Sequence, residues 1–487
     1  MRTAAAILTV LLMALSLPAQ QPRTSESIEV SIVNVDVVVT DAKGRRVTGL
    51  TANDFEIREG GKTRPIAQFA EHRPDADVES RPPRTVVVLL ERSPMNDQHV
   101  VELYDAVRKL LRETITGPAD RAAVIAWSGG AIIRQPFSNS IAVLESALER
   151  MQREHEAVWR DRAAEAALRD AAAAQADVAT EKIAAAMTPV DDLDLATHQL
   201  ARVRRKVPAL EALLNSMGAI EGRKILVLGL HARGLMDDIA GMESVTTVRR
   251  RAVNATLHQP VIRAANASGV AIYPIYPRGG ARAIPRNSAV DDPVGGPPAQ
   301  NVNFVEVLEE LSNKTGGRMA WGSSDIAAML PRAAEDVQSY YSLGYTTAPS
   351  GKDATRAIEV RAKNRAHKVR ARTQAVDKSD QTAIREQLVA NLYHGLGAVA
   401  LPVEIEVSER TGGRVQVRVT TEGKARPLSF YVVAGSPVGV ASEVLTRTQT
   451  LPVADFTLEV DGNADQISAG VVDEGTKEFG TKRVPLP

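Results

Sequence analysis

The densest group of possible metal ligands in the sequence is an acidic run followed by one histidine. Its members share a segment rich in helix-forming alanine and arginine: Asp191, Asp192, Asp194 and His198. A cation site needs several oxygen or nitrogen ligands that converge on one point. Carboxylates near the start of a helix also stabilise the helix through its dipole. We therefore interpret the run as a helix start, with a cation site as the alternative.

A second run has the alternating oxygen side chains of a calcium loop, namely Asp461, Asn463 and Asp465. In such a loop the sixth residue is glycine, and the twelfth is a glutamate that binds the ion through two oxygens. These positions hold Gln466 and Val472, which cannot take those roles. The sequence therefore predicts a polar hairpin turn at 461–465.

Residue patterns typical of catalysis are scarce. No two of the eight histidines stand four residues apart, which excludes the zinc-binding helix of His-Glu-x-x-His proteases, and we expect these histidines in loops and on the surface. The sequence has no cysteine, which excludes disulfides, thiol nucleophiles and thiolate metal sites. It also has no Gly-x-Ser-x-Gly elbow and no phosphate-binding glycine loop. A serine triad assembled in space stays open, but we predict that the protein is not an enzyme.

The charge balance limits the kinds of partner. Lys+Arg and Asp+Glu both number 59, so the net charge is zero, and aromatic residues make up 4% of the chain. Nucleic-acid binding would favour a basic surface, so we expect no nucleic-acid partner. One short basic run, Arg202, Arg204 and Arg205, is a candidate contact for an acidic protein partner. A solvated helix face is the alternative.

Residues 1–20 have the layout of a secretory signal peptide. Arg2 precedes an apolar run over 4–17, and Ala19 offers a small residue for cleavage. The apolar run is shorter than the roughly 20 residues that span a bilayer. We therefore expect an exported protein, periplasmic or extracellular, with no transmembrane segment after cleavage.

The rest of the chain divides by its hydrophobic periodicity. Alternating apolar residues predict a small all-β unit over 24–75, and alternation returns over 340–375, where we expect strands that complete this unit. Between them, over 84–340, apolar runs of strand length alternate with helical segments. This pattern predicts an α/β fold with a doubly wound parallel sheet. Five short strands within 384–487 predict a C-terminal β-sandwich of immunoglobulin type.

One segment of the α/β unit differs in composition. Residues 141–217 hold no strand-like run and are rich in alanine and in charged residues that favour helices. The segment is too long for a simple connection, so we predict a helical insertion. Alanine-rich helices gain most of their stability from a neighbour, and the insertion is therefore a candidate contact surface.

In this order, the blocks resemble the von Willebrand factor A-related exported proteins of acidobacteria. The resemblance rests on a succession of segments: 35–45, 49–57, 120–127, 222–228, 264–273, 315–318 and 339–345. It implies a doubly wound A-domain whose binding loops lie at the carboxyl ends of the parallel strands. Related A-domains bind a divalent cation there through an Asp-x-Ser-x-Ser loop, a threonine and a second aspartate.

The metal loop that this resemblance implies is degenerate here. Glu91 takes the place of the aspartate, Ser93 keeps one hydroxyl and Met95 replaces the other. A thioether is a poor ligand for Mg²⁺, which prefers oxygen. Gly229 stands where the second carboxylate is expected, and Arg92 adds a positive charge beside the loop. We therefore expect no metal or other cofactor, with Mg²⁺ as the alternative.

These observations predict a non-catalytic protein-binding protein, an adhesion or scaffold protein built on an A-like domain. Its candidate contacts are Glu91, Arg92 and Ser93, together with the basic run on the insertion. One alternative is a cell-envelope hydrolase with a site formed between domains, which a pocket holding a carboxylate and a histidine would favour. The other is a structural subunit of a surface assembly. A broad apolar patch on the insertion helices would favour binding or assembly.

Overall fold

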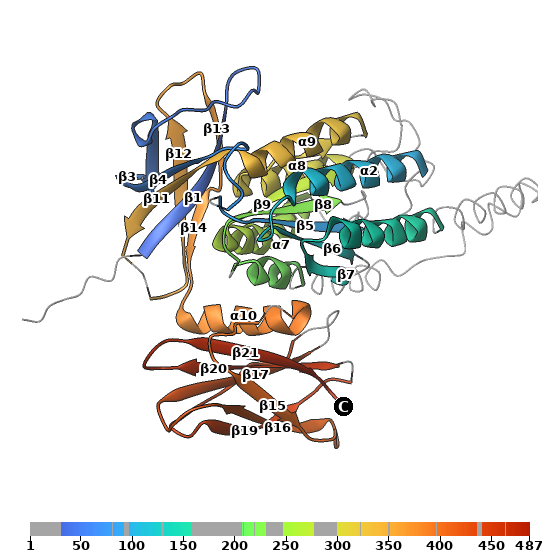
Figure 1. Ribbon diagram of the computed structural model, residues 1–487, viewed down its shortest axis with the longest axis vertical. Coiled ribbons are helices and arrows are strands. Elements are labelled where there is room, and N and C mark those ends of the chain that lie inside the picture. The colour runs from blue at the N-terminus through green and yellow to red at the C-terminus, as the bar shows by residue number, and fades with distance from the viewer. Residues whose placement is uncertain are drawn as a thin grey trace, which may run out of the picture.

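The structure is a computed structural model of the 487-residue chain. It describes residues 31–79, 81–91, 97–127, 131–157, 207, 209–218, 220–229, 247–276, 300–321, 323–348, 351–395, 397–435, 441–462 and 464–487. The predicted signal peptide lies outside these ranges. Figure 1 shows a β-sandwich beside an α/β layer, with a second β-sandwich below them.

The α/β layer is built on one six-stranded sheet. Its strands, in spatial order, are β10 (Ala320–Trp321), β9 (Val270–Tyr276), β8 (Arg223–Gly229), β5 (Arg84–Glu91), β6 (Arg121–Trp127) and β7 (Ala131–Ser138). The predicted α/β class is confirmed, but the prediction of a wholly parallel sheet is wrong, because β7 runs antiparallel to β6. Only residues 128–130 join these two strands, and a parallel neighbour would need a crossover of a dozen or more residues.

Helices cover both faces of this sheet. One face packs on α2 (Asp97–Thr114), α9 (Ser323–Gln338) and the helical residues 141–157. The other packs on α7 (Thr247–Ser268), α8 (Gln300–Thr315) and the helical residues 209–216. Along β5, Val86, Val88 and Leu90 enter the first core, while Val87 and Leu89 enter the second. Burial on both faces explains why β5 is a continuous apolar run.

The first β-sandwich combines strands that precede the α/β layer in the sequence with strands that follow it. One of its sheets has the order β13-β1-β11-β4, and the other has the order β14-β12-β2-β3. The early strands are β1 (Ser31–Thr40), β2 (Phe55–Glu59), β3 (Lys62–Arg64) and β4 (Ile66–His72). The late strands are β11 (Tyr340–Thr347), β12 (Ala354–Ala362), β13 (Lys368–Ala371) and β14 (Gln374–Asp377). Both groups contribute to one core, in which Val35 and Ile57 pack with Leu343 and Ile358.

The second β-sandwich has more strands than the five predicted. Its sheets have the orders β15-β16-β19 and β18-β17-β20-β21. The strands are β15 (Val403–Val407), β16 (Arg414–Thr421), β17 (Leu428–Gly435), β18 (Leu445–Gln449), β19 (Val453–Glu459), β20 (Gln466–Asp473) and β21 (Phe479–Pro485). The hairpin predicted at 461–465 is wrong, because β19 pairs with β16 whereas β20 pairs with β17 and β21. These residues therefore connect two sheets. The immunoglobulin type stays a prediction.

A helix that the sequence pattern did not predict packs between the α/β layer and the second sandwich. The predicted β-sandwich over 384–487 begins inside α10 (Asp380–His394). The hydroxyl of Ser379 accepts a hydrogen bond from the Thr382 amide, and Gly395 ends the helix at φ 67°, the left-handed conformation typical of helix ends. Leu388 and Leu392 pack against the second sandwich on one side and against the helix at 209–216 on the other. With burial on two sides, α10 lacks the single apolar stripe that reveals most surface helices.

Candidate binding edge of the central sheet

The topology of the central sheet marks one edge as a candidate binding site. From β5 the chain continues to β6 on one side, and it later returns to β8 on the other side. Such a reversal of strand order opens a crevice at the carboxyl ends of the strands, where ligands of open α/β sheets bind. The reversal lies between β5, which ends at Glu91, and β8, which ends at Gly229.

Of the predicted contact residues, Glu91 is the one that the structure describes at this edge. It is half-buried, and its backbone pairs in register with Trp127, the last residue of β6. The other predicted contacts, Arg92, Ser93, Arg202, Arg204 and Arg205, lie outside the described residues, as do Met95 of the degenerate metal loop and the acidic run at 191–198. The structure therefore places one predicted site residue and leaves the others as predictions.

Gly229 has no room for the second carboxylate of a metal site. A Cβ atom added there would lie 2.5 Å from Cδ2 of Leu90, which is fully buried in the core. The five parallel strands end at Glu91, Trp127, Gly229, Tyr276 and Trp321. Of these five residues, Glu91 alone has a carboxylate. Across the described part of the chain, no group of three or more His, Asp or Glu side chains could hold a metal ion. These residues do not fit a hard divalent cation, which needs several oxygen ligands.

The possible metal ligands among the described residues predict how the Tm responds to divalent cations. We expect Mg²⁺, Mn²⁺ or EDTA to change the Tm by no more than about 1 °C, because a ligand raises the Tm only when it binds the folded state. Melting curves of the metal-free protein with and without each additive would test this. A stabilisation by Mg²⁺ that EDTA removes would contradict it.

Trp127 is a residue at this edge that the sequence analysis did not single out. Its side chain is 1% exposed, and its indole N–H has no hydrogen-bond acceptor in the structure of the described residues. A buried indole N–H is normally satisfied. The sequence signal for Trp127 was its position at the end of a predicted strand. The strand order that brings it beside Glu91 is not readable from local sequence.

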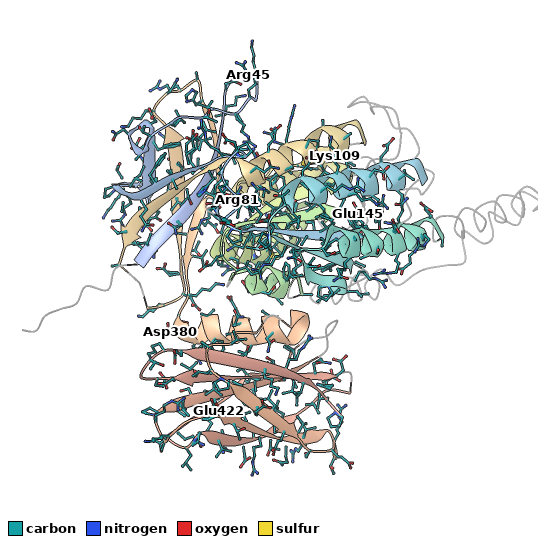
Figure 2. The ribbon with its side chains drawn as sticks, viewed as in Figure 1. Arg45, Arg81, Lys109, Glu145, Asp380 and Glu422 are labelled. Carbon is teal, nitrogen blue, oxygen red and sulfur yellow. The ribbon has the colours of Figure 1, made fainter. Side chains whose placement is uncertain are left out.

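The opposite edge of the sheet is covered by the first sandwich. Arg223, the first residue of β8, donates a hydrogen bond to Asp36 of β1 at 3.0 Å, and its guanidinium lies 5.2 Å from the ring centroid of Tyr340. Burial lowers the pKa of the neighbouring Lys224 to about 8. Figure 2 shows Arg81 at the same junction, where it donates to Asp120 at 2.8 Å. The sandwich thus covers the amino ends of the strands and leaves their carboxyl ends uncovered by it.

Two described histidines contradict the expectation of surface or loop positions. His155 and His258 are 1% and 5% exposed, and both lie on helices. Nδ1 of His155 is 3.3 Å from the Tyr104 hydroxyl, whose pKa is raised by burial. Nε2 of His258 is 2.7 Å from a Glu310 oxygen, which links α7 to α8. Both pairs join packed helices, and neither lines a described pocket.

A shallow pocket on the second sandwich is lined by Thr411, Arg414 and Glu459 together with neighbouring glycines. It holds a carboxylate but no histidine. Among the described residues, this pocket therefore lacks the carboxylate and histidine together that would favour a hydrolase. Within the described ranges, no helix is long and apolar enough to cross a bilayer.

Comparisons with known proteins identify A-type domains among similar solved structures. No family model matches the sequence, and no curated protein matches it. The von Willebrand factor domain of the pilus tip protein Mfa5 from Porphyromonas gingivalis is 12% identical and covers 52% of this chain and 94% of its own, with a TM-score of 0.27. A von Willebrand factor type A protein from Catenulispora acidiphila is 10% identical and covers 87% of this chain and 73% of its own, with a TM-score of 0.23.

The conserved hypothetical protein BatB from Bacteroides thetaiotaomicron is 10% identical and covers 52% of this chain and 98% of its own, with a TM-score of 0.23. These neighbours are von Willebrand factor A-domain proteins at low identity. At such TM-scores they decide nothing about function, which has to be inferred from the residues of this chain.

Proposed function

We propose that this chain is an exported, non-catalytic binding protein related to A-domain proteins. It engages a protein partner at the carboxyl edge of the central sheet, between β5 and β8, without a bound metal ion or other cofactor. The observation that carries this proposal is the placement of Glu91 at the strand reversal, on the edge opposite the one that the first sandwich covers. Export is supported by the composition of residues 1–20.

The chemistry of this edge favours a partner that offers a basic side chain. Glu91 lies where the strand order reverses and has an interaction within the chain. A carboxylate has about four lone-pair positions, so an arginine or lysine of the partner protein would bind it alongside that contact and fix the orientation of the complex. Gly229 has no side chain, so the second carboxylate that a shared metal ion would need is missing at this position. A direct ion pair therefore replaces the metal-bridged contact that the family resemblance implies.

A charge reversal at Glu91 tests this proposal. We expect Glu91→Lys to reduce recovery of the partner at least about tenfold in a crosslinking pull-down from the native envelope fraction, because like charges across an interface repel. The matched control is Glu422→Lys, an exposed position on the second sandwich that Figure 2 labels. This control should recover the partner like the unchanged protein.

Circular dichroism of both variants separates a lost contact from a lost fold. If folded Glu91→Lys protein still recovers every partner, the carboxyl edge at β5 is not the contact surface. Recovery of further copies of the same chain and of no other protein would instead indicate the structural subunit that the sequence left open.

A further inference from the structure

Three guanidinium groups converge at the junction between the first sandwich and the α/β layer. Arg46 follows β1, Arg370 lies on β13, and Arg318 lies between α8 and β10. Arg46 and Arg370 pair with the carboxylate of Asp336 of α9, whose side chain is 0% exposed, and Arg318 lies near both guanidinium groups. We call these four residues the junction cluster.

The hydrogen-bonding capacity of Asp336 is already used. Its Oδ1 accepts from Arg46 Nη2 and from Arg370 Nη2, the latter at 2.7 Å. Its Oδ2 accepts from Arg370 Nη2 and from the Tyr273 hydroxyl, both at 2.7 Å. A carboxylate offers about four lone-pair positions, so Asp336 has none left for Arg318.

Two buried donors of the junction cluster consequently have no acceptor. Nη1 of Arg46 and Nε of Arg318 are buried, and neither has a hydrogen-bond partner in the structure of the described residues. A buried donor without an acceptor costs roughly 1–3 kcal/mol, more for a charged group. Unmade bonds at two neighbouring guanidinium groups therefore point to an acceptor that the described residues do not supply.

The charges of the junction cluster lead to the same conclusion. Two of the three positive groups pair with the one buried carboxylate, while the other charged groups near the third, Arg332 and the acid Glu335, are both exposed. Burial and the neighbouring Arg370 lower the pKa of Arg46 to about 10, and the same causes lower the pKa of Arg318. The three guanidinium groups therefore lie near one another, and the one buried negative charge that the described residues place among them is that of Asp336.

We infer that the junction cluster binds a small oxyanion of the phosphate or sulfate class, held by Arg46 and Arg318 beside Arg370. Guanidinium N–H groups match the oxygens of such anions in geometry and charge. The side chains of Arg46 and Arg370 are 16% and 21% exposed, so the cluster reaches solvent. This site lies on the side of the sheet that the first sandwich covers. Its proposal does not depend on the proposed contact at the carboxyl edge.

The direct test is a phosphate titration of the full chain by isothermal calorimetry, with sodium chloride replaced at constant ionic strength. We expect saturable binding of one phosphate. Because the anion binds the folded state, the Tm should also rise by roughly 3–4 °C when phosphate is about 100 times its Kd. Absence of saturable heat together with an unchanged Tm would overturn the proposal.

The variant Arg318→Gln distinguishes this site from a general salt effect. Arg318 makes no hydrogen bond through Nε, so its loss should leave the fold intact and raise the Tm in chloride by relieving repulsion. Phosphate affinity should fall at least about tenfold, a typical loss for one charge-assisted contact. The control Arg361→Gln changes an exposed arginine of β12 and should titrate like the unchanged protein.

Equal phosphate affinity in Arg318→Gln and the unchanged protein would overturn the assignment, whatever the stability of the variant. A parallel titration with glycerol phosphate shows whether the ligand is the free ion or the phosphate group of a larger molecule. Binding of either one supports the shared chemistry, and binding of neither overturns it.

Discussion

Replacing Asp336 by asparagine is expected to lower the free energy of unfolding by about 3–5 kcal/mol, the usual cost of removing one partner from a buried ion pair. The carboxylate is 0% exposed and accepts hydrogen bonds from Arg46, Arg370 and Tyr273. Asparagine keeps the size of the side chain but loses its charge. The guanidinium groups of Arg46 and Arg370 would then remain partly buried without a compensating charge.

Urea denaturation in chloride buffer, free of phosphate and sulfate, measures this loss without interference from a bound anion. The matched control is Asp455→Asn, which removes a carboxylate from an exposed pair with Arg418 at 2.7 Å. Exposed pairs contribute at most about 1 kcal/mol. If Asp336→Asn costs no more than this control, the junction cluster does not stabilise the fold through its charges.

The substitution Gly317→Ala is expected to destabilise the protein by a similar amount, about 3–5 kcal/mol. A Cβ atom at this position would lie 1.8 Å from the Ile272 carbonyl oxygen and 2.7 Å from its carbon. Both are backbone atoms of β9, which lies between β8 and β10 in the central sheet, so no side-chain rotation can relieve the clash. The Gly317 carbonyl also accepts from Arg370 at 3.1 Å, and a shift here would disturb the junction cluster.

A steric origin can be checked with Gly462→Ala, because nothing lies within 4 Å of a Cβ atom there. This control should change the free energy of unfolding by less than about 0.5 kcal/mol, as is usual for surface substitutions. Chemical denaturation monitored by circular dichroism gives both values. Near-equal stabilities of the two variants would mean that β9 and the end of α8 can separate at little cost.

The sequence predicted the strands that are buried on both faces and missed elements with more exposed surroundings. Continuous apolar runs located β5, β6, β8 and β9, because a strand covered by helices on both sides has no polar face. The strand β18 is missed for the opposite reason. It lies at a sheet edge, and its inner residues Thr446, Arg447 and Thr448 are exposed, so its sequence reads as a polar loop.

The candidate site was predictable only where it follows from a strand end. Glu91 comes directly after a buried apolar run, so its place at the carboxyl edge could be expected from the chain alone. The junction cluster has no such signal. Arg46, Arg318 and Arg370 come from separate elements far apart in the chain, and only the packing of the sandwich on the sheet brings them together near Asp336 of α9.

The division of the first sandwich between two distant parts of the chain determines when it can fold. Strands β1 and β4 both pair with β11, yet the 267 residues from Arg73 to Ser339 are synthesised between β4 and β11. At about 5–20 residues per second, the early strands wait roughly 15–50 s for their partner. During that time their edges stay open to pairing with other chains. Rapid folding of the intervening domain, or a chaperone, would limit such pairing.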